Sequence, residues 1–489
     1  MRSLLLLAIS AVTIGAVEVD WKSIQTKRGD VLPDFSYVGY RQGDHKLPSS
    51  QPRNASAIIA ASESSSEDQT SAIQKALDDV AAAGGGVVEL AAGKHYLSGS
   101  ATISIGTKTW LRGADKDKTV VVVKGSPRSV FTLGAADVKA ITGASSNITT
   151  SYVPIGALQL VVQDASVFKV NQTVYVQRPA AAAWIRANGM ADLVRDGKPQ
   201  VWIKAGTLFK QPRIIQSIDG NTLDLDIPLT DSIEKKYSVG SVQVYSAKGI
   251  NNAGVENFQI QLSPSCSGAP ITDPDCAGYT AVSFQPFTVD SWALNLTMTG
   301  FVAGFVRVAE NAQRITLENL ISVRDAVSDG SAGWGADISI GGTQVLVKNC
   351  ASQATVDGAR SFAVALGGQV AGPNAILNHK AALASQIVQP HMRWAHGLLV
   401  DRSQAGVELI NRNTAGSGHG WTINAGVAWN SDAAWRAESP PLGVNWAVGM
   451  RGTKGSPSNA TEIATGESIT PASLYTAQLQ ARRAAARAF

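Results

Sequence analysis

Side chains suited to chemistry gather in one stretch of this sequence, between Pro390 and Asn430. It holds three of the six histidines of the chain, together with three arginines and three tryptophans: His391, His396, His419, Arg393, Arg402, Arg412, Trp394, Trp421 and Trp429. Histidine exchanges protons near neutral pH, arginine binds carboxylates through its planar guanidinium, and tryptophan packs on flat apolar surfaces. The density of these residue types predicts an active face.

Two turn segments upstream carry polar residues that could join this face. The segment VRDAVSDG supplies Arg324, Asp325 and Asp329, and TVDGARSF supplies Asp357 and Arg360. In a parallel solenoid, equivalent positions on adjacent coils stack about 4.8 Å apart. We therefore expect these turns and the histidine-rich stretch to line one continuous groove.

These residue types match the needs of a lyase that cleaves an acidic polysaccharide by β-elimination. Such an enzyme must neutralise a uronate carboxylate, remove the proton at C5 and protonate the leaving oxygen, and arginine and histidine suit these tasks. The two histidines would share the proton transfers, the arginines would hold the carboxylate, and the tryptophans would stack on sugar faces. No metal or other cofactor is needed. We predict as catalytic residues His391, His419, Arg393, Arg360 and Asp357, and as substrate-binding residues Arg412, Trp394, Trp421, Arg324 and Asp325.

The acidic residues leave other functions open. A glycoside hydrolase needs two carboxyl groups, about 5 Å apart for retention or about 6.5 to 9.5 Å apart for inversion, and Asp325 or Asp329 with Asp357 could supply them. The surrounding cations argue against a hydrolase, because they depress the pKa of a carboxyl group and disfavour a general acid. The same aspartates could ligate Ca²⁺. A non-catalytic protein that binds carbohydrate is the remaining alternative.

Length and composition limit the architecture that positions these residues. At 489 residues the chain exceeds one ordinary compact core, so several domains or an elongated repeat are expected. Only 16% of residues are charged and 46 are glycine, which indicates an ordered, turn-rich protein. A net charge of +4 without a basic run argues against nucleic acid as a partner.

The second half of the chain alternates short apolar segments with Gly, Asn and Asp turns, at a period of roughly 20 to 35 residues. Strands this short, without strong polar alternation, are typical of a parallel solenoid with a buried inner face. Nearer the N-terminus, Ile73, Ala76, Leu77 and Val80 fall at helical spacing. They predict a helix that covers the open edge of the first coil.

The segments GGGVVELAAGKHYLSG and TKTWLRGA, which follow this helix, resemble the opening of the pectate-lyase-like superfamily of right-handed parallel β-helix proteins. HMRWAHGLLVD and NRNTAGSGHGWTINAGVAWN are similar to a subgroup of secreted members, over nearly the whole mature chain. The resemblance implies a right-handed parallel β-helix that acts on a carbohydrate polymer. The calcium-binding acids and the basic catalytic motif of true pectate lyases are not matched, so the resemblance transfers no catalytic residue.

The expected fold is all-β, with an N-terminal helical cap, a small antiparallel β insertion and a C-terminal helix. A hairpin signal at SIDGNTLDLDI marks the insertion, whose Trp184, Arg186, Arg195 and Trp202 either pack inside it or overhang the groove. The predicted segments are a signal peptide (1–16), an N-terminal arm (17–66), the cap and first coils (67–150), the insertion (151–247), the main coils (248–435) and a C-terminal loop and helix (436–489).

The opening MRSLLLLAISAVTIGA has the pattern of a secretory signal, and no stretch reaches the roughly 20 apolar residues of a membrane span. We expect a secreted, soluble, extracellular monomer with a polysaccharide as its partner. Cys266 and Cys276 share one polar loop and are expected to form a disulfide, which leaves Cys350 as a buried thiol. Five Asn-x-Ser/Thr triplets are candidate glycosylation sites: Asn54, Asn147, Asn171, Asn295 and Asn459.

Overall fold

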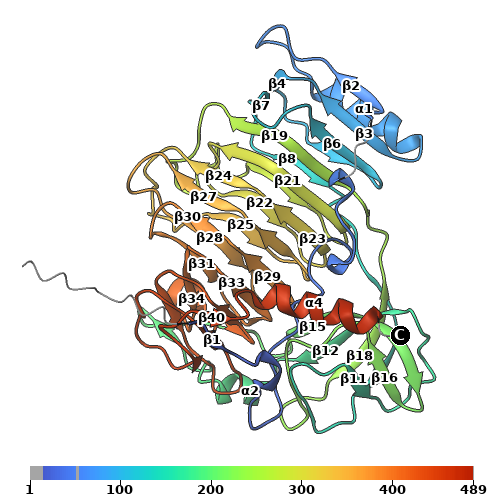
Figure 1. Cartoon of the computed structure of the whole chain (residues 1–489), viewed down its shortest axis with the longest axis vertical. Helices are drawn as coiled ribbons and strands as arrows, with labels where there is room; N and C mark the ends of the chain where they lie inside the picture. Colours follow the sequence, from blue (N-terminus) through green and yellow to red (C-terminus); the bar gives the residue numbers. More distant parts are fainter. Residues whose placement is uncertain (1–14, 51–53, 488–489) are drawn as a thin grey trace, which may run out of the picture.

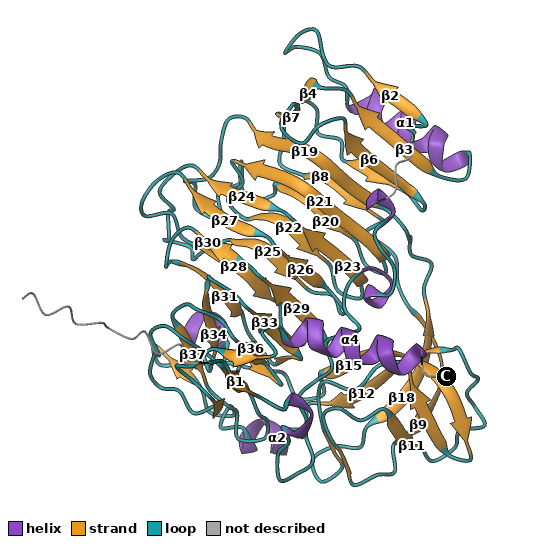
Figure 2. Cartoon of the chain, viewed as in Figure 1, coloured by secondary structure: helices purple, strands orange, loops and turns teal. Residues whose placement is uncertain are grey.

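A computed structural model describes residues 15–50 and 54–487. The chain winds into a right-handed parallel β-helix, which confirms the predicted fold class (Figure 1). Each coil contributes strands to parallel sheets, and the coils follow one another along the long axis of the molecule (Figure 2). Most of the expected signal peptide, residues 1–14, lies outside the described residues.

Three parallel sheets form the walls of the β-helix. The first contains β2 (Ala57–Ile59), β3 (Gly86–Leu90), β6 (Thr109–Gly113), β23 (Gln313–Glu318), β26 (Leu346–Lys348), β29 (Asn374–Leu377), β33 (Leu398–Asp401), β36 (Val427–Trp429), β38 (Trp446–Val448) and β39 (Thr461–Ile463). The second contains β4 (Gly93–Leu97), β7 (Thr119–Val123), β24 (Ile321–Arg324), β27 (Ala351–Ala354) and β30 (Lys380–Ala381). Two long strands, β19 (Gly254–Leu262) and β21 (Val289–Thr299), take part in both sheets.

The third sheet lies next to the predicted active residues. It contains β5 (Ile103–Ile105), β8 (Ser129–Leu133), β20 (Thr280–Phe284), β22 (Gly304–Val308), β25 (Ala336–Ile340), β28 (Ser361–Leu366), β31 (Gln386–Pro390), β34 (Gly406–Leu409) and β37 (Trp435–Ala437). The chain leaves β8 for the insertion, whereas each of the other strands is followed by a turn that leads into the first sheet. These turns stack along one edge of the β-helix.

The interior is filled by apolar side chains from all three sheets, such as Val255, Ile315, Val364 and Leu398, each fully buried. Parallel strands covered on their inner face need this near-continuous run of Val, Ile and Leu. The coils continue past residue 435, where the C-terminal loop was predicted to begin, because β38 and β39 still pair with the first sheet. Turns rich in Gly, Asn and Pro interrupt these last strands and make their pattern weak in the sequence.

An asparagine ladder forms the corner between the first and second sheets. Its members adopt left-handed backbone angles, with φ between 53° and 64°, which asparagine tolerates well: Asn257, Asn295, Asn319, Asn349 and Asn378. Nδ2 of Asn295 donates to Asn257 (2.8 Å), and Nδ2 of Asn319 donates to Asn295 (2.9 Å). Asn295 is half-buried and its Nδ2 donates within this ladder, and the glycosylation predicted there stays a prediction. The other four triplets have exposed or half-buried asparagines: Asn54, Asn147, Asn171 and Asn459.

Two helices pack on the β-helix, one over its first coil and one along its side. Helix α1 (Thr70–Ala82) buries Ile73, Leu77 and Val80 against the first coil, as predicted for the cap. Helix α4 (Leu474–Arg487) lies across the later coils (Figure 1), where Asp401 at the end of β33 accepts hydrogen bonds from Tyr475 N (3.0 Å) and Ser473 Oγ (2.8 Å). No helix in the described ranges is long and apolar enough to cross a membrane.

The insertion is a six-stranded antiparallel sheet packed beside the C-terminal coils (Figure 1). Its strands are, in spatial order, β11 (Gln159–Val161), β16 (Thr222–Leu225), β15 (Leu208–Asp219), β12 (Thr173–Pro179), β18 (Ser241–Ser246) and β9 (Ile141–Asn147). The antiparallel insertion was predicted, although it begins earlier than expected because β9 already belongs to it. A short helix, α2 (Ala182–Ala187), and a hairpin, β13 (Val194–Arg195) with β14 (Lys198–Pro199), extend from it.

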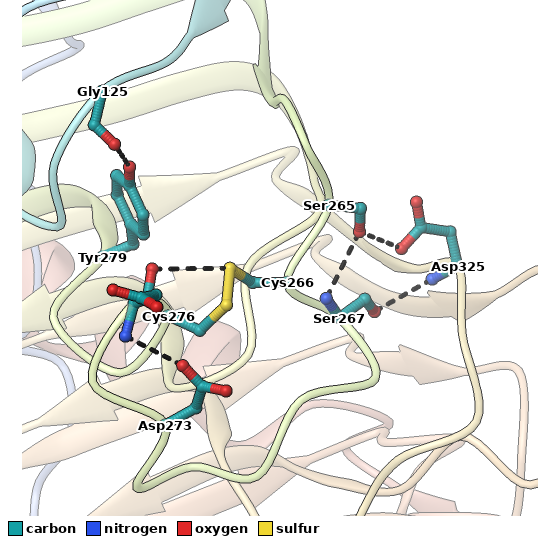
Figure 3. Close-up of a disulfide and its surroundings, with 9 residues drawn as sticks. Gly125, Ser265, Cys266, Ser267, Asp273, Cys276, Tyr279 and Asp325 are labelled. Atoms are coloured by element: carbon teal, nitrogen blue, oxygen red, sulfur yellow. Dashed lines mark hydrogen bonds between the residues drawn. A yellow bond between two sulfur atoms is a disulfide. The ribbon is translucent and has the colours of Figure 1, made fainter.

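The three cysteines behave as the sequence indicated. Cys266 and Cys276 form a disulfide with Cα atoms 5.5 Å apart (Figure 3). Cys350 is a free, buried thiol whose pKa burial raises to about 12, so it stays protonated and inert.

Candidate active site

Two histidines meet where the turns after β31 and β34 stack on each other. His391 follows β31 directly, and His419 lies at the end of a short helical turn, α3 (Ala415–Gly418). Their ring centroids are 4.6 Å apart and the rings are tilted by 54°. The backbone N–H of Arg393 donates to the carbonyl oxygen of His419 over 3.0 Å, which fixes the two turns against each other.

Three arginines surround this pair. Arg412 Nη1 lies 3.2 Å from His391 Nδ1 and 2.9 Å from the carbonyl oxygen of His391. Arg393 Nη2 donates to Ser417 Oγ (2.8 Å), and Arg195, from the insertion hairpin, donates to the carbonyl oxygen of Gly416 (3.0 Å). In the part of the chain that the structure describes, Arg393 and Arg412 form no ion pair, and Arg195 pairs only with the exposed Asp196 at 3.5 Å. The cluster therefore carries an excess of positive charge suited to an anion, although the charge of Glu408 acts on Arg412 without forming an ion pair.

The environment keeps both imidazoles neutral. Burial, and then the positive charges of Arg412 and Arg393, lower the pKa of His419 to about 4. Burial and Arg412 likewise lower the pKa of His391 to about 4. Desolvation and nearby cations both disfavour the charged form of histidine. At neutral pH the site thus combines neutral bases with fixed cations.

The hydrogen bonds distinguish the two histidines. A guanidinium has only donors, so Nδ1 of His391 must accept from Arg412 and its neutral ring carries the proton on Nε2. Nδ1 of His419 is buried and has no hydrogen-bond partner among the described residues. Among the described residues no arginine donates to the ring of His419, so His419 is the imidazole left to act as a base.

Outward-facing residues of the third sheet complete the surroundings. The ring of Phe362 on β28 contacts His391 edge-on, with centroids 5.1 Å apart. Gln389 on β31 donates a hydrogen bond to Glu408 on β34. Burial lowers the pKa of Arg412, and the charge of Glu408 partly opposes this. Phe362, Gln389 and Glu408 were not predicted from the sequence, where their signal is the alternation with inward-facing apolar residues in these strands.

A buried polar network holds the turn that carries His391 and Arg393. Asp231 of the insertion, fully buried, is paired with Arg178 (2.7 Å) and accepts from Trp394 Nε1 (3.0 Å) and Asn424 Nδ2 (2.9 Å). Arg393 and Trp394 both have left-handed backbone angles, φ 56° and 59°. Consecutive non-glycine residues in this region are costly, and such strain persists only where the surroundings impose it. The insertion thus shapes the active turn.

The loop that carries His419 depends on a close approach at Gly416. Its φ is +58°, and a Cβ there would lie 2.1 Å from Nε2 of His419. A side chain at this position would displace the imidazole. On the other side of His419, Gly420 permits a close approach to the insertion, because a Cβ there would lie 2.3 Å from Trp202.

Both tryptophans predicted to stack on sugars are buried instead. Trp394 is 1% exposed and packs edge-on against Trp184, with centroids 4.8 Å apart. Trp421 is 8% exposed and donates its Nε1 to the carbonyl oxygen of Asn188 (3.0 Å). The predicted substrate contacts of Trp394 and Trp421 are therefore wrong, because these rings join the insertion to the β-helix.

Arg324 and Asp325 also have structural roles. Arg324 is 1% exposed and forms an ion pair with the buried Asp337 at 2.8 Å, so it cannot reach a substrate. Asp325 accepts from Ser265 Oγ (2.9 Å), and its backbone N–H donates to Ser267 Oγ (3.1 Å), beside the disulfide loop (Figure 3). The predicted substrate contacts of Arg324 and Asp325 are therefore wrong, because both residues hold neighbouring parts of the fold together.

Asp357 and Arg360 lie at the wrong edge of the third sheet. They precede β28, whereas His391 and Arg412 follow β31 and β34, so the length of a strand separates the two groups. Arg360 instead lies over the ring of Trp334, 4.8 Å from its centroid. The expectation that the two upstream turns and the histidine-rich stretch line one continuous groove is therefore wrong. Asp325, Asp329 and Asp357 are likewise remote from the histidines, and no three acidic, histidine or cysteine side chains within the described ranges gather to hold a metal ion.

A cavity of about 900 Å³ lies away from the histidines, between the N-terminal arm, the first sheet and α4. Its charged groups are largely satisfied by one another, since Lys348 pairs with Glu318 at 2.7 Å and Arg482 with Asp44 at 2.9 Å. It contains none of the residues of the histidine cluster. We therefore place the chemistry at the histidines.

Fold and site together define a parallel β-helix protein with a basic, histidine-containing surface at one edge of its third sheet. No family model and no curated protein matches the sequence. Among solved structures the chain is similar to the tailspike protein gp49 of Pseudomonas phage LKA1 (13% identity, TM-score 0.35, covering 80% of this chain and 71% of that one). A tailspike protein mutant of E. coli bacteriophage HK620, in complex with a pentasaccharide, is similar at 11% identity and a TM-score of 0.41, covering 85% of this chain and 56% of that one. Similarities this low transfer no function to this chain.

Proposed function

We propose that this protein is a secreted enzyme that degrades an acidic polysaccharide by β-elimination at the cluster of His391, His419, Arg393 and Arg412. The observation that carries the proposal is the coexistence of two neutral imidazoles with arginines that lack acidic partners within the described ranges. A uronate supplies the missing anion. Its C5 proton becomes acidic enough to remove only when the adjacent carboxylate is neutralised, which guanidinium groups do well.

The proposed reaction gives each residue a distinct role. Arg393 and Arg412 bind the uronate carboxylate, with Arg195 adding positive charge from the insertion. His419 takes the C5 proton, the electron pair of that bond forms the C4–C5 double bond, and the C4–O4 bond breaks. The imidazolium so formed is a strong acid among these cations and returns the proton to the leaving oxygen. His391, held by Arg412, orients the site through its Nε2–H.

Substrate binding also adjusts the base. A carboxylate placed among the arginines offsets the positive charges that lower the pKa of His419, so this pKa rises in the complex. A base that is neutral in the free enzyme thus becomes stronger when it is needed.

Product analysis tests the reaction type. Purified protein is incubated with pectate, alginate and glucuronan, and the absorbance of the unsaturated uronate is followed together with the release of reducing ends. Elimination predicts that both signals rise in proportion and that both are lost in His419→Ala. Reducing ends without absorbance would establish hydrolysis, and binding without any product would favour a non-catalytic carbohydrate-binding protein.

Secretion and the monomeric state are part of the proposal. The apolar N-terminal pattern supports secretion, and the disulfide between Cys266 and Cys276 fits an oxidising compartment. Mass spectrometry of protein from a eukaryotic host would give the mature N-terminus and any glycans. Light scattering would give the oligomeric state.

A further inference from the structure

A second cavity, of about 540 Å³, adjoins the histidine cluster along the same row of turns. One wall is the start of β15 in the insertion, including Lys210, and the other is formed by the turns after β22, β25 and β28. These turns stack in the same order as the coils, and the next turn in the row carries His391 and Arg393. The cavity therefore lies on the path that an extended polymer bound at the cluster would follow.

Direct contacts join the cavity to the cluster. Gln369, which lines the cavity, donates from its backbone N–H (2.9 Å) and from Nε2 (3.0 Å) to the carbonyl oxygen of Arg393. A Cβ on Gly368 would lie 3.1 Å from the Cβ of Arg393. Because neighbouring coils are about 4.8 Å apart, the cavity extends over the coils immediately next to the reacting centre.

The lining suits sugar hydroxyl groups. Glycines at positions 341, 342, 367 and 368 leave the floor without side chains. Lys210 and Glu310 stand at the rim, and neither forms an ion pair within the described residues. The cavity thus has one positive and one negative side chain beside exposed backbone, whereas the charged groups of the histidine cluster are arginines. The cavity is therefore built for neutral hydroxyl-rich groups more than for a further carboxylate.

We propose that this cavity binds the sugar residues adjacent to the cleaved linkage, so that the enzyme acts on extended chains. The inference rests on the proposed function and extends it to substrate length. Lys210, Glu310 and Gln369 supply the polar contacts, and Gly367 leaves room for the sugar ring.

Gly367 allows the cavity to be filled without straining the backbone. A Cβ there would meet only ordinary contacts, 3.7 Å from Val370 Cγ2, and its φ is not in the left-handed region. Gly367→Leu should therefore fold and occlude the cavity. Gly143→Leu is the matched control, because Gly143 lies on the exposed strand β9 and its Cβ would lie 3.5 Å from Val244. Lys210→Ala is a second variant at an exposed position, in case the leucine disturbs folding.

The experiment compares uronate-containing oligosaccharides of increasing length. For Gly367→Leu we expect kcat/KM on long chains to fall about tenfold, with the shortest cleaved oligosaccharide unaffected, and for Lys210→Ala a smaller loss of the same kind. An equal loss on short and long chains, or no loss on long chains, would overturn the subsite. Calorimetric binding of the same oligosaccharides to His419→Ala and to His419→Ala/Gly367→Leu tests the subsite independently of the elimination reaction. Length-dependent affinity that the leucine removes supports the subsite even if no unsaturated product forms, whereas affinity independent of length overturns it while leaving elimination standing.

Discussion

The guanidinium of Arg412 donates to Nδ1 of His391 over 3.2 Å and to the carbonyl oxygen of the same residue over 2.9 Å. One side chain thereby fixes the ring, its tautomer and the turn that carries it. His419, 4.6 Å away between ring centroids, keeps an unpartnered Nδ1. The two histidines therefore have different roles in the proposed reaction. His391 is a positioned hydrogen-bond donor, and His419 is the base.

Activity should depend on pH through the protonation of His419. His419 must be neutral to accept a proton, and its pKa of about 4 in the free protein places the acidic limb of kcat/KM near pH 4, with a plateau above it. The limb of kcat should lie at higher pH, because a bound carboxylate raises this pKa. Initial rates between pH 3 and 9 give both profiles. A kcat/KM limb near 6.5 would contradict the proposed environment.

The arginines should control the position of that limb. Arg393 lowers the pKa of both histidines, so Arg393→Met should move the acidic limb of kcat/KM to higher pH in addition to weakening substrate binding. Arg186→Met removes an equal charge from the exposed face of α2 and should leave the limb in place. A limb that does not move in Arg393→Met would show that this charge does not act on the base.

Replacement of Arg412 tests which edge of the third sheet carries the chemistry. Arg412→Met removes a carboxylate donor and the hydrogen bond to His391, and we expect kcat/KM to fall about 10²- to 10³-fold, as for loss of one preorganised donor. Arg360→Met, at the opposite edge over Trp334, should change kcat/KM less than twofold. The reverse ranking of these variants would place the chemistry at the Asp357 and Arg360 turn.

Gly416 is expected to matter for activity more than for stability. Gly416→Ala introduces a Cβ against His419 Nε2, so we predict at least a tenfold loss of kcat/KM. Gly220→Ala is a matched control, with φ +54° and no atom within 4 Å of its Cβ. Each alanine should cost about 1 to 2 kcal/mol of stability for the left-handed backbone. Thermal melts give the stability of Gly416→Ala and Gly220→Ala, and initial rates give their activity. Full activity in both variants would show that Gly416 does not position His419.

Asp401 makes stability depend on pH. Burial raises the pKa of Asp401 to about 7 in the folded protein, whereas an unfolded aspartate has a pKa near 3.9. The contribution of Asp401 to the free energy of unfolding is therefore full below about pH 3.9. It declines by up to about 1.4 kcal/mol per pH unit as the pH rises to 7. Histidines with a lowered pKa act in the opposite sense over part of this range: His95, His379, His391, His396 and His419. The test is therefore the difference between the wild type and Asp401→Asn, which retains an acceptor for Ser473 and Tyr475. Urea unfolding at pH 4, 5.5, 7 and 8.5 should show the wild type losing stability relative to the variant as pH rises. A constant difference would mean that Asp401 ionises normally.

The local pattern of the chain specified much of this protein. Short apolar strands, turn residues and the helix with Ile73, Leu77 and Val80 are local signals, because each coil buries its own inner face, and they predicted the β-helix, its cap and the antiparallel insertion. The pairing of Cys266 with Cys276 was visible because both lie in one loop. His391, His419, Arg393 and Arg412 could be singled out because they lie on two consecutive turns of the same edge.

Tertiary structure decided which candidates share a surface. Whether a turn precedes or follows the third sheet depends on how many strands each coil contributes, and only the folded chain shows that Asp357 and Arg360 fall at the far edge from His391. The insertion, distant in sequence, buries Trp394 and Trp421 and brings Arg195 to the His419 loop. Residue type in the sequence thus identified the chemistry, whereas coil register and the packing of the insertion determined which of those residues can act together.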